Sequence, residues 1–320
     1  MRVLVTGGIG FIGAHVVTQL VEHGHIVTCF DIRGPTPVLE PVEADVEFVR
    51  GDVTDPVQLA NVVGESDPDR IVHLASLLGR ASQEDPRRAF EVNVDGTLDL
   101  LEIAASHGVE RVVVASSVSA YGRVSGADRL DETAPQQPEN VYGLTKYAVE
   151  RLGRVYQSKT GVEFAAMEPV HGLGPDRARG NVEDAYIVKA AVSGTSLTVP
   201  DVPDPIEIIY VEDTARAFVA ALTAADLPHD RYLVGSGERA TLADVVAMVR
   251  DAVPDAELEL FEPSDAGELA LHPVTDTSRL AEDFGWEPQY GIDDAVEAYV
   301  EWLESNPEKW SFDGADVPWE

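Results

Sequence analysis

The feature that most constrains the fold is a glycine-rich turn at residues 6–13, TGGIGFIG, which joins a short apolar run to a longer amphipathic one. The same alternation continues along the first half of the chain. Candidate strands cover residues 2–6, 26–31, 47–50, 70–74, 111–115 and 163–167, and candidate helices cover residues 11–22, 56–63, 86–107 and 142–160. Such alternation is typical of a parallel sheet covered by helices. The sequence therefore predicts an α/β fold, a Rossmann-type doubly wound parallel sheet with a smaller C-terminal region.

The glycine-rich turn also predicts a dinucleotide site. Gly7, Gly10 and Gly13 leave room for backbone N–H groups and a helix dipole to face a pyrophosphate. The motif alone is a weak signal, because tight turns share its composition. Asp31 strengthens it, since it ends the second candidate strand, where a carboxylate accepts hydrogen bonds from an adenosine ribose and repels a 2′-phosphate. We therefore expect NAD, while Arg33 nearby keeps NADP as an alternative.

A tyrosine and a lysine begin the last of these candidate helices. Tyr142 and Lys146 are four residues apart, so their side chains share one helical face. Such pairs are common by chance, but Ser117 follows the strand at 111–115, close to where a nicotinamide would lie. A free tyrosine has a pKa of about 10, and a neighbouring cation favours the phenolate. We expect Tyr142 to take a proton from a substrate hydroxyl, while Ser117 hydrogen-bonds the developing carbonyl.

In a series of motifs between residues 6 and 288, the chain resembles the extended short-chain dehydrogenases/reductases, the nucleotide-sugar epimerase/dehydratase superfamily. The motifs are TGGIGFIG, GDVTD, HLAS, NVDGT, ASSVSAYG, YGLTK, IYVED and FGWEP. The resemblance implies that Ser117, Tyr142 and Lys146 are the catalytic triad and that Asn93 lies near the cofactor. It also implies a homodimer, formed through a four-helix bundle by the helices around Asn93 and Tyr142.

The turns after the third and fourth candidate strands are also expected to reach the cofactor. The Asp52 side chain could contact adenine or cap a helix, and both alternatives stay open. The expected cofactor-binding residues are Gly7, Gly10, Phe11, Ile12, Gly13, Asp31, Ile32, Arg33, Asp52, Val53, Leu74, Ala75, Ser76, Asn93, Ala115, Tyr142, Lys146, Pro169, Val170 and His171.

Departures from the family pattern bear on the reaction. Dehydratases of the family carry an Asp-Glu pair just after the catalytic hydroxyl residue, where this chain has Val118 and Ser119. Neither side chain performs general acid/base catalysis, which argues against dehydration. Ser119 also stands where related decarboxylases carry Glu, and Val118 where bifunctional epimerase-reductases carry Cys. Oxidation, reduction and simple epimerisation remain.

Arginines that grip the substrate diphosphate in nucleotide-sugar enzymes of the family are missing. Their usual positions hold Glu168 and Ile206, and residues 269–275 contain no arginine. Each lost charge-assisted hydrogen bond costs about 1.5–3 kcal/mol. Arg177 and Arg179 could replace the missing clamp, but their acidic neighbours favour a solvated loop face.

Other segments are more similar to the branch that contains L-threonine dehydrogenase and sugar dehydrogenases. We therefore expect an NAD-dependent oxidoreductase acting on a secondary alcohol of a small polar substrate, such as a sugar, a sugar acid or a hydroxy amino acid. The alternative is a UDP-glucose-type 4-epimerase with retained NAD, and a third possibility is a non-catalytic NAD sensor. Candidate substrate-pocket residues are Leu77, Leu78, Ser117, Ser119, His171, Arg177, Arg179 and Tyr186.

The strand–helix alternation weakens after its first half. Residues 1–167 are expected to form the NAD-binding Rossmann domain, with a return of the chain at 205–232. Residues 168–204 and 233–320 contain clusters of Gly and Pro and are expected to form the substrate-binding region, with a final helix at 292–303.

The charge balance limits the partners. Asp and Glu number 57 against 23 Lys and Arg, a net charge of −34 that repels nucleic acids and anionic membranes. Only four residues are lysines, a pattern that resembles proteins of salt-loving organisms, with an acidic mesophile as the alternative. One cysteine and the lack of a Cys/His cluster with zinc spacing predict no metal site. A strand at the first residues and no long apolar run predict a cytoplasmic protein.

Overall fold

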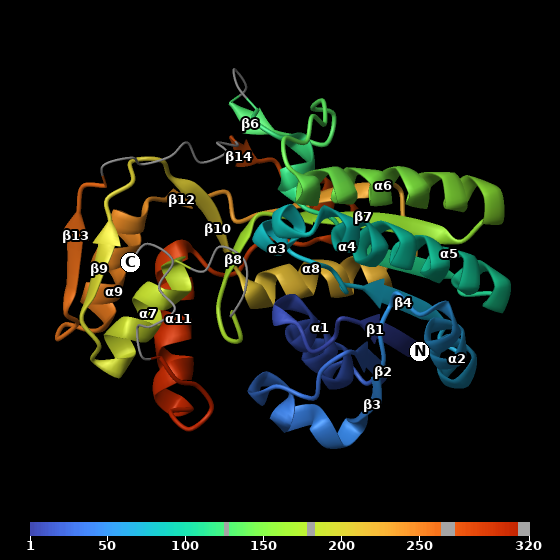
Figure 1. Ribbon diagram of the computed structural model, residues 1–320, viewed down its shortest axis with the longest axis horizontal. Coiled ribbons are helices and arrows are strands. Elements are labelled where there is room, and N and C mark those ends of the chain that lie inside the picture. Colours follow the sequence, from blue (N-terminus) through green and yellow to red (C-terminus); the bar gives the residue numbers. More distant parts are fainter. Residues whose placement is uncertain (125–127, 178–182, 264–272, 313–320) are drawn as a thin grey trace.

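The computed structural model describes residues 1–124, 128–177, 183–263 and 273–312 (Figure 1). Its centre is a seven-stranded parallel sheet in the order β3-β2-β1-β4-β5-β7-β11. The strands are β1 (Arg2–Thr6), β2 (Ile26–Asp31), β3 (Val46–Arg50), β4 (Arg70–His73), β5 (Arg111–Ala115), β7 (Glu163–Pro169) and β11 (Arg231–Val234). This arrangement confirms the predicted doubly wound fold.

Helices cover both faces of the sheet (Figure 1). On one face α1 (Phe11–Glu22) packs against α8 (Val211–Thr223), and on the other α5 (Gly96–His107) packs against both α2 (Pro56–Ser66) and α6 (Val141–Thr160). The apolar residues of the strands alternate between these two layers: Val3 and Val5 of β1 belong to the first core, and Leu4 belongs to the second. A strand buried on both faces reads as a continuous apolar run, which explains why the pattern was visible in the sequence.

The helix expected at 86–107 is interrupted. It consists of α4 (Pro86–Phe90), a π-helical turn (Glu91–Asp95) and α5, and a short helix α3 (Gly79–Glu84) precedes it. Asn93 lies in the π-helical turn, and its buried amide hydrogen-bonds to the Leu77 backbone and to Thr145. These bonds connect the π-helical turn to the loop at Leu77 and to α6. The hydrophobic periodicity of residues 86–107 does not predict such contacts, so it does not predict the interruption.

A second lobe lies beyond the carboxyl ends of the sheet strands, on the left of Figure 1. Three helices, α7 (Glu183–Ser193), α9 (Leu242–Ala252) and α11 (Ile292–Ser305), share a separate apolar core. Two small sheets join it, β8 (His171–Leu173) with β10 (Ile206–Tyr210) and β12 (Arg239–Ala240), and β9 (Leu197–Pro200) with β13 (Leu258–Phe261). The expected final helix is confirmed as α11.

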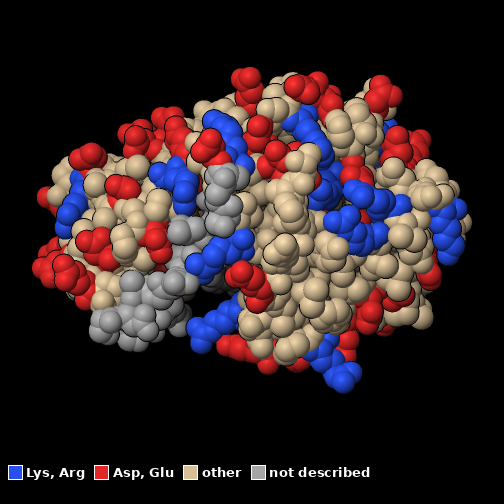
Figure 2. Space-filling model, turned by 90° about the horizontal axis from the view of Figure 1, so that it is seen from above, with Lys and Arg blue, Asp and Glu red and all other residues tan. Residues whose placement is uncertain are grey.

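Smaller elements complete the chain. They are the 3-10 helices η1 (Pro37–Asp45) and η3 (Val118–Tyr121), the paired strands β6 (Arg129–Leu130) and β14 (Val274–Thr275), and α10 (Ser278–Phe284). Figure 2 shows a hollow between the two lobes with Lys and Arg side chains on its rim, although acidic residues predominate in the chain. Within the described ranges, no helix is long and apolar enough to cross a membrane, and no group of three or more His, Cys, Asp or Glu side chains is placed to hold a metal ion.

Candidate active site

The residues expected to bind the cofactor lie at one edge of the seven-stranded sheet. Asp31, Ala115 and Pro169 end β2, β5 and β7, and the other expected residues follow strand ends or lie on the helices that start there. Ligands of open parallel sheets bind outside the carboxyl ends of the strands. The structure therefore brings the expected residues to the edge where a dinucleotide would bind.

The glycine-rich turn packs too tightly for side chains. Gly7 has a φ of 70°, and a Cβ atom there would lie 2.5 Å from the backbone nitrogen of Ala75. A Cβ atom on Gly13 would lie 2.2 Å from the Gly7 carbonyl oxygen. Gly10 caps α1 without a side-chain hydrogen bond, which leaves the first N–H groups of the helix for a ligand. This cradle fits a pyrophosphate.

The adenosine end of the expected site is a cavity of about 360 Å³. It is lined by Ile32, Arg50, Gly51, Asp52 and Gln58. Beside it, the buried Asp31 carboxylate accepts hydrogen bonds from the backbone N–H groups of Ile9 (3.2 Å) and Arg33 (3.0 Å). These bonds fix the carboxylate at the end of β2, where a ribose would lie. The cavity and the glycine cradle together fit NAD.

Asp52 stabilises a turn and does not cap a helix. Its carboxylate accepts hydrogen bonds from the backbone and hydroxyl of Thr54, each 2.9 Å long, and forms an ion pair with Arg88 at 2.9 Å. It also lines the adenosine-end cavity. Asp55, not Asp52, caps α2 by accepting hydrogen bonds from Val57 and Gln58.

Asn93 lies behind the loop that follows β4. Its carbonyl oxygen accepts hydrogen bonds from the Leu77 N–H (2.7 Å) and the Ser76 hydroxyl (3.1 Å), and its amide donates to the Thr145 hydroxyl (3.0 Å). Asn93 therefore holds the loop that contains Ser76, Leu77 and the exposed Leu78 against α6. The structure assigns it a positioning contact with this loop.

The three expected catalytic residues come together between β5 and α6. Ser117 follows β5, and its hydroxyl donates to the Ser119 hydroxyl (3.2 Å) and hydrogen-bonds Tyr142. Asn140 caps α6 by accepting a hydrogen bond from the Gly143 N–H, which fixes Tyr142 in the first turn. The Lys146 ammonium donates to the Ala115 carbonyl at 2.8 Å and lies 5.4 Å from the centre of the Tyr142 ring.

Burial shifts the pKa values of Tyr142 and Lys146. It raises the pKa of Tyr142 to about 12, and the hydrogen bond from Ser117 and the charge of Arg177 oppose that rise. Burial lowers the pKa of Lys146 to about 7, and the negative charge of Glu150 opposes that fall. The phenol therefore needs nearby cations to act as a base, and the lysine charge depends on a carboxylate one helical turn away.

Arg177 is the cation that acts on Tyr142. Its guanidinium carbon lies 4.9 Å from the centre of the Phe11 ring, in the helix that follows the glycine-rich turn. The prediction of a solvated loop face is therefore wrong for Arg177, because the side chain stacks on an aromatic ring beside the catalytic tyrosine. Arg179 lies outside the described residues.

A histidine–aspartate pair lies on the substrate side. The Nε2 atom of His171 is 2.8 Å from the Oδ2 atom of Asp184, which is fully buried on α7. Although burial opposes the change, His171 and Arg177 lower the pKa of Asp184 below its usual range. Tyr186, two residues further along α7, packs its ring 5.5 Å from that of Phe312. Asp184 thus joins the two candidate pocket residues His171 and Arg177 electrostatically.

Glu168 does not face the substrate. Its carboxylate is fully buried in β7 and accepts a 2.8 Å hydrogen bond from the Tyr121 hydroxyl. The interpretation of Glu168 as a lost phosphate-binding position is therefore wrong, because the alternation of a β-strand turns this side chain away from the site. Ile206 begins β10 and packs against the core of the second lobe.

Sequence reasoning missed several residues of this region. Arg50 and Gln58 line the adenosine-end cavity, and Asp184 partners His171. Glu150 lies four residues after Lys146, the same helical spacing that identified Tyr142 and Lys146, so this signal was available in the sequence. No local pattern indicates the pairing of His171 with Asp184.

Residues 3–235 match the family described as the NAD dependent epimerase/dehydratase family. The UDP-glucose 4-epimerase of Corynebacterium glutamicum is 29% identical over 310 residues, 91% of this chain and 92% of that protein. A bifunctional UDP-glucose 4-epimerase and UDP-xylose 4-epimerase of Pisum sativum is 29% identical in an alignment that covers 98% of each chain. The crystal structure of Thermus thermophilus UDP-glucose 4-epimerase in complex with NAD has a TM-score of 0.85 and 29% identity, and the match covers 95% of this chain and 99% of that one.

The chain belongs to the NAD-dependent epimerase/dehydratase family, and it is an enzyme whose cofactor is NAD. The relatives named above favour the nucleotide-sugar epimerases over the branch that contains L-threonine dehydrogenase. That finding corrects the branch expected from the sequence.

Proposed function

We propose that the protein is a nucleotide-sugar 4-epimerase of the UDP-glucose type, with NAD retained through the catalytic cycle. The observation that carries the proposal is the Ser117–Tyr142–Lys146 constellation beside the glycine cradle, in a chain that matches UDP-glucose 4-epimerases along nearly its full length. Val118 and Ser119 follow the catalytic serine, so the site lacks the acid pair that dehydration requires.

The side chains of the site account for the proton movements of such a reaction. Tyr142 takes the proton from the sugar hydroxyl as its carbon is oxidised, and returns it to the same oxygen when that carbon is reduced from the opposite face. Ser117 donates a hydrogen bond to this oxygen and holds it in line with the phenol. Bound NAD supplies reversible hydride transfer at the carbon. The charge of Arg177 lowers the pKa of Tyr142. Lys146, 5.4 Å from the centre of the Tyr142 ring, favours the phenolate while its ammonium is charged.

Recognition of the nucleotide sugar then depends on groups that replace the usual arginines. Arg177 and His171 are the candidates, because both lie near the buried Asp184 and Arg177 also contacts Phe11. A cation held by a fully buried carboxylate keeps its orientation without a ligand. We propose that these two side chains contact the substrate.

A second candidate function is oxidation of a small polar alcohol by an NAD-dependent dehydrogenase. Ile206 favours it, because an aliphatic side chain stands where related enzymes place a phosphate-binding arginine. The two candidates differ in net redox change. An epimerase interconverts UDP-glucose and UDP-galactose without accumulating NADH, and a dehydrogenase accumulates NADH with its substrate.

The test uses protein purified in high salt. Interconversion of the two UDP-sugars is followed by chromatography, and NADH absorbance is followed with sugars, sugar acids and L-threonine. Interconversion without net NADH supports the epimerase. NADH formation with a member of the panel and no interconversion would replace it by the dehydrogenase. The same rates in the Tyr142→Phe variant would contradict both.

We also propose a homodimer formed through α4 and α6. Phe90, Leu144 and Val155 are 38%, 44% and 58% exposed on these helices, which leaves apolar surface that a partner subunit would cover. Light scattering after size exclusion tests this assembly, and Val155→Glu should yield monomers. A monomeric wild type would refute it. Cytoplasmic location and a halophilic source stay predictions from the composition.

A further inference from the structure

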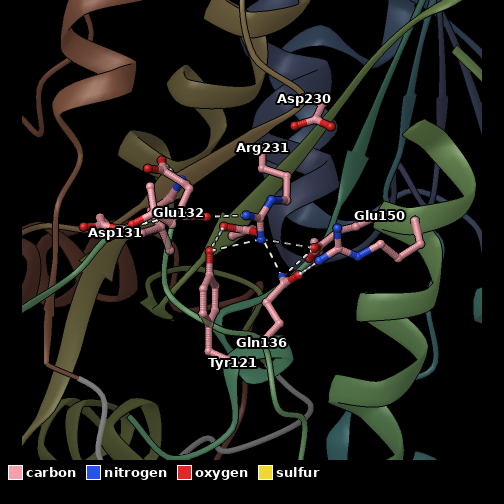
Figure 3. Close-up of polar contacts among 12 residues, drawn as sticks. Tyr121, Asp131, Glu132, Gln136, Glu150, Asp230 and Arg231 are labelled. Carbon is pink, nitrogen blue, oxygen red and sulfur yellow. Dashed lines mark hydrogen bonds and ion pairs between the residues drawn. The ribbon is translucent and has the colours of Figure 1, made fainter. Parts of the chain in front are cut away.

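A buried polar cluster lies beside the catalytic residues, between α6, β7 and β11 (Figure 3). At its centre is Arg231 of β11, whose Nη1 atom lies 3.7 Å from Glu150 of α6 and 3.5 Å from Glu168 of β7. Both carboxyl groups are buried, with side-chain exposures of 1% and 0%. Two acidic groups therefore share one guanidinium away from solvent.

The charges around Arg231 do not balance if both carboxyl groups are ionised. Gln136 bridges the pair, because its amide donates to Glu150 and to Glu168, but it contributes no net charge. Glu132, the third buried acid, has its own partners in Arg279 (3.3 Å) and the Leu233 N–H (3.0 Å). An unpaired buried carboxylate is costly and binds a proton instead. The hydrogen bond between Glu150 and Glu168 requires such a proton on one of the two carboxyl groups, so the pair shares a proton.

The contacts decide which carboxyl group carries it. Glu150 accepts hydrogen bonds from the Ser116 hydroxyl and from Gln136, and Lys146 lies one helical turn away. Glu168 accepts a 2.8 Å bond from the Tyr121 hydroxyl, and it also hydrogen-bonds Glu150. Burial, and then repulsion by Glu150, raise the pKa of Glu168 well above its usual range. Donors and the nearby ammonium therefore favour the charge on Glu150 and the proton on Glu168.

We propose that Glu150 is a positioning residue of the active site: its charge, secured because Glu168 holds the shared proton, keeps Lys146 in the ammonium form next to Tyr142. The geometry supports a direct path, since Glu150 and Lys146 are four residues apart on α6 and Ser116 neighbours the catalytic Ser117. Burial brings the pKa of Lys146 to about 7 even with the opposing charge of Glu150, so loss of that charge favours the neutral amine still further. The expected effect on catalysis rests on the proposed epimerase function. The effect of Glu150 on the protonation of Lys146 does not depend on that function.

Other titratable and charged groups face this region, and none replaces Glu150. They are Tyr142 and Arg151 on α6, His73 on β4, Tyr121 on η3, Glu132 after β6, Asp230 just before β11, Arg231 on β11, and Arg279 on α10. Burial lowers the pKa of His73 to about 3, so the ring is neutral across the working range. Asp230 pairs with Arg154, and burial raises the pKa of Tyr121, which stays protonated.

The test measures the Lys146 proton directly. The chain contains only four lysines, so protein labelled with ε-¹³C-lysine gives four side-chain signals, and the Lys146→Arg variant identifies the one that belongs to this residue. Glu150→Gln should lower the Lys146 titration midpoint by about one pH unit or more. Glu168→Gln is the matched control, because an amide imitates a protonated carboxyl, and the midpoint should stay unchanged. An unchanged midpoint in Glu150→Gln, or an equal fall in both variants, would overturn the proposal.

Ser116→Ala keeps the carboxylates and removes one donor to Glu150, so it tests the proposal if Glu150→Gln does not fold. The Lys146 midpoint should fall by less than in Glu150→Gln, and a rise would contradict the proposal. For catalysis, the alkaline limb of the pH–rate profile for UDP-sugar interconversion should move to lower pH in Glu150→Gln. If the wild type does not interconvert UDP-sugars, the proposed function fails, and the lysine titration still decides the role of Glu150.

Discussion

Replacement of Arg177 by methionine tests the electrostatic argument for the catalytic tyrosine. Arg177 lowers the pKa of Tyr142, which burial otherwise raises to about 12. Removal of the guanidinium therefore raises that pKa and reduces the fraction of phenolate at every pH below it. A neighbouring opposite charge is worth about one pKa unit or more, and one unit changes the phenolate fraction about tenfold. Methionine keeps the apolar contact with Phe11 and lacks the charge.

We expect the kcat of Arg177→Met to fall at least about tenfold at pH 7 and by a similar factor up to pH 10, because Tyr142 titrates above that range with or without Arg177. Arg177→Lys is the control, because lysine keeps the charge and should retain most of the rate. The assay is UDP-sugar interconversion measured between pH 6 and 10. Full retention of kcat in Arg177→Met, or an equal deficit in Arg177→Lys, would refute the reasoning, since Arg177 would then act through binding or folding and not through the Tyr142 proton. A changed KM with an unchanged kcat would lead to the same conclusion.

Three further variants test other parts of the structure. Tyr142→Phe should lower kcat by about a thousandfold or more with the melting temperature kept, because no other group takes the proton; substantial residual activity would contradict this. Gly13→Ala should abolish retention of NAD after purification, since its Cβ would lie 2.2 Å from a carbonyl oxygen of the glycine-rich loop, whereas Gly64→Ala, with its nearest contact at 3.6 Å, should retain it. Arg111→Met should destabilise the fold by about 3–5 kcal/mol in urea unfolding, because this fully buried guanidinium donates to three carbonyls at the end of α8; Arg80→Met, at an exposed pair, should cost less than about 0.5 kcal/mol.

The parts of the fold that could be predicted are those encoded within a short window. Strands such as β1 and β5 are continuous apolar runs, because helices cover the sheet on both faces. The glycine-rich turn is dictated by steric contacts of its own loop, as Gly13 shows. Tyr142 and Lys146 share a helical face by their spacing alone. In each case the cause lies within a few residues of the effect.

The rest depends on partners far apart in the sequence. Glu168 is separated by 47 residues from Tyr121, and its burial follows from the face of β7 to which its side chain points. A motif alignment gives the place of such a residue in the sequence but not the face of the strand to which its side chain points. For this reason Glu168 was assigned from the sequence to the substrate side. Asp184 reaches His171 only because α7 packs against β8. The π-helical turn at Asn93 has the same origin, since its hydrogen bonds lead to Leu77 and Thr145.

Each of the two cations next to Tyr142 has a buried carboxyl group close to it. Lys146 has Glu150 one turn along its helix, and Arg177 lies near Asp184. Both carboxyl groups are buried, so water screens these pairs weakly and each acid strongly affects the charge of its cation. The excess of acidic residues on the surface carries no such information, because salt and water screen it. Two buried acids therefore act on the surroundings of Tyr142 through the neighbouring cations, and alignment of catalytic residues alone would leave them out.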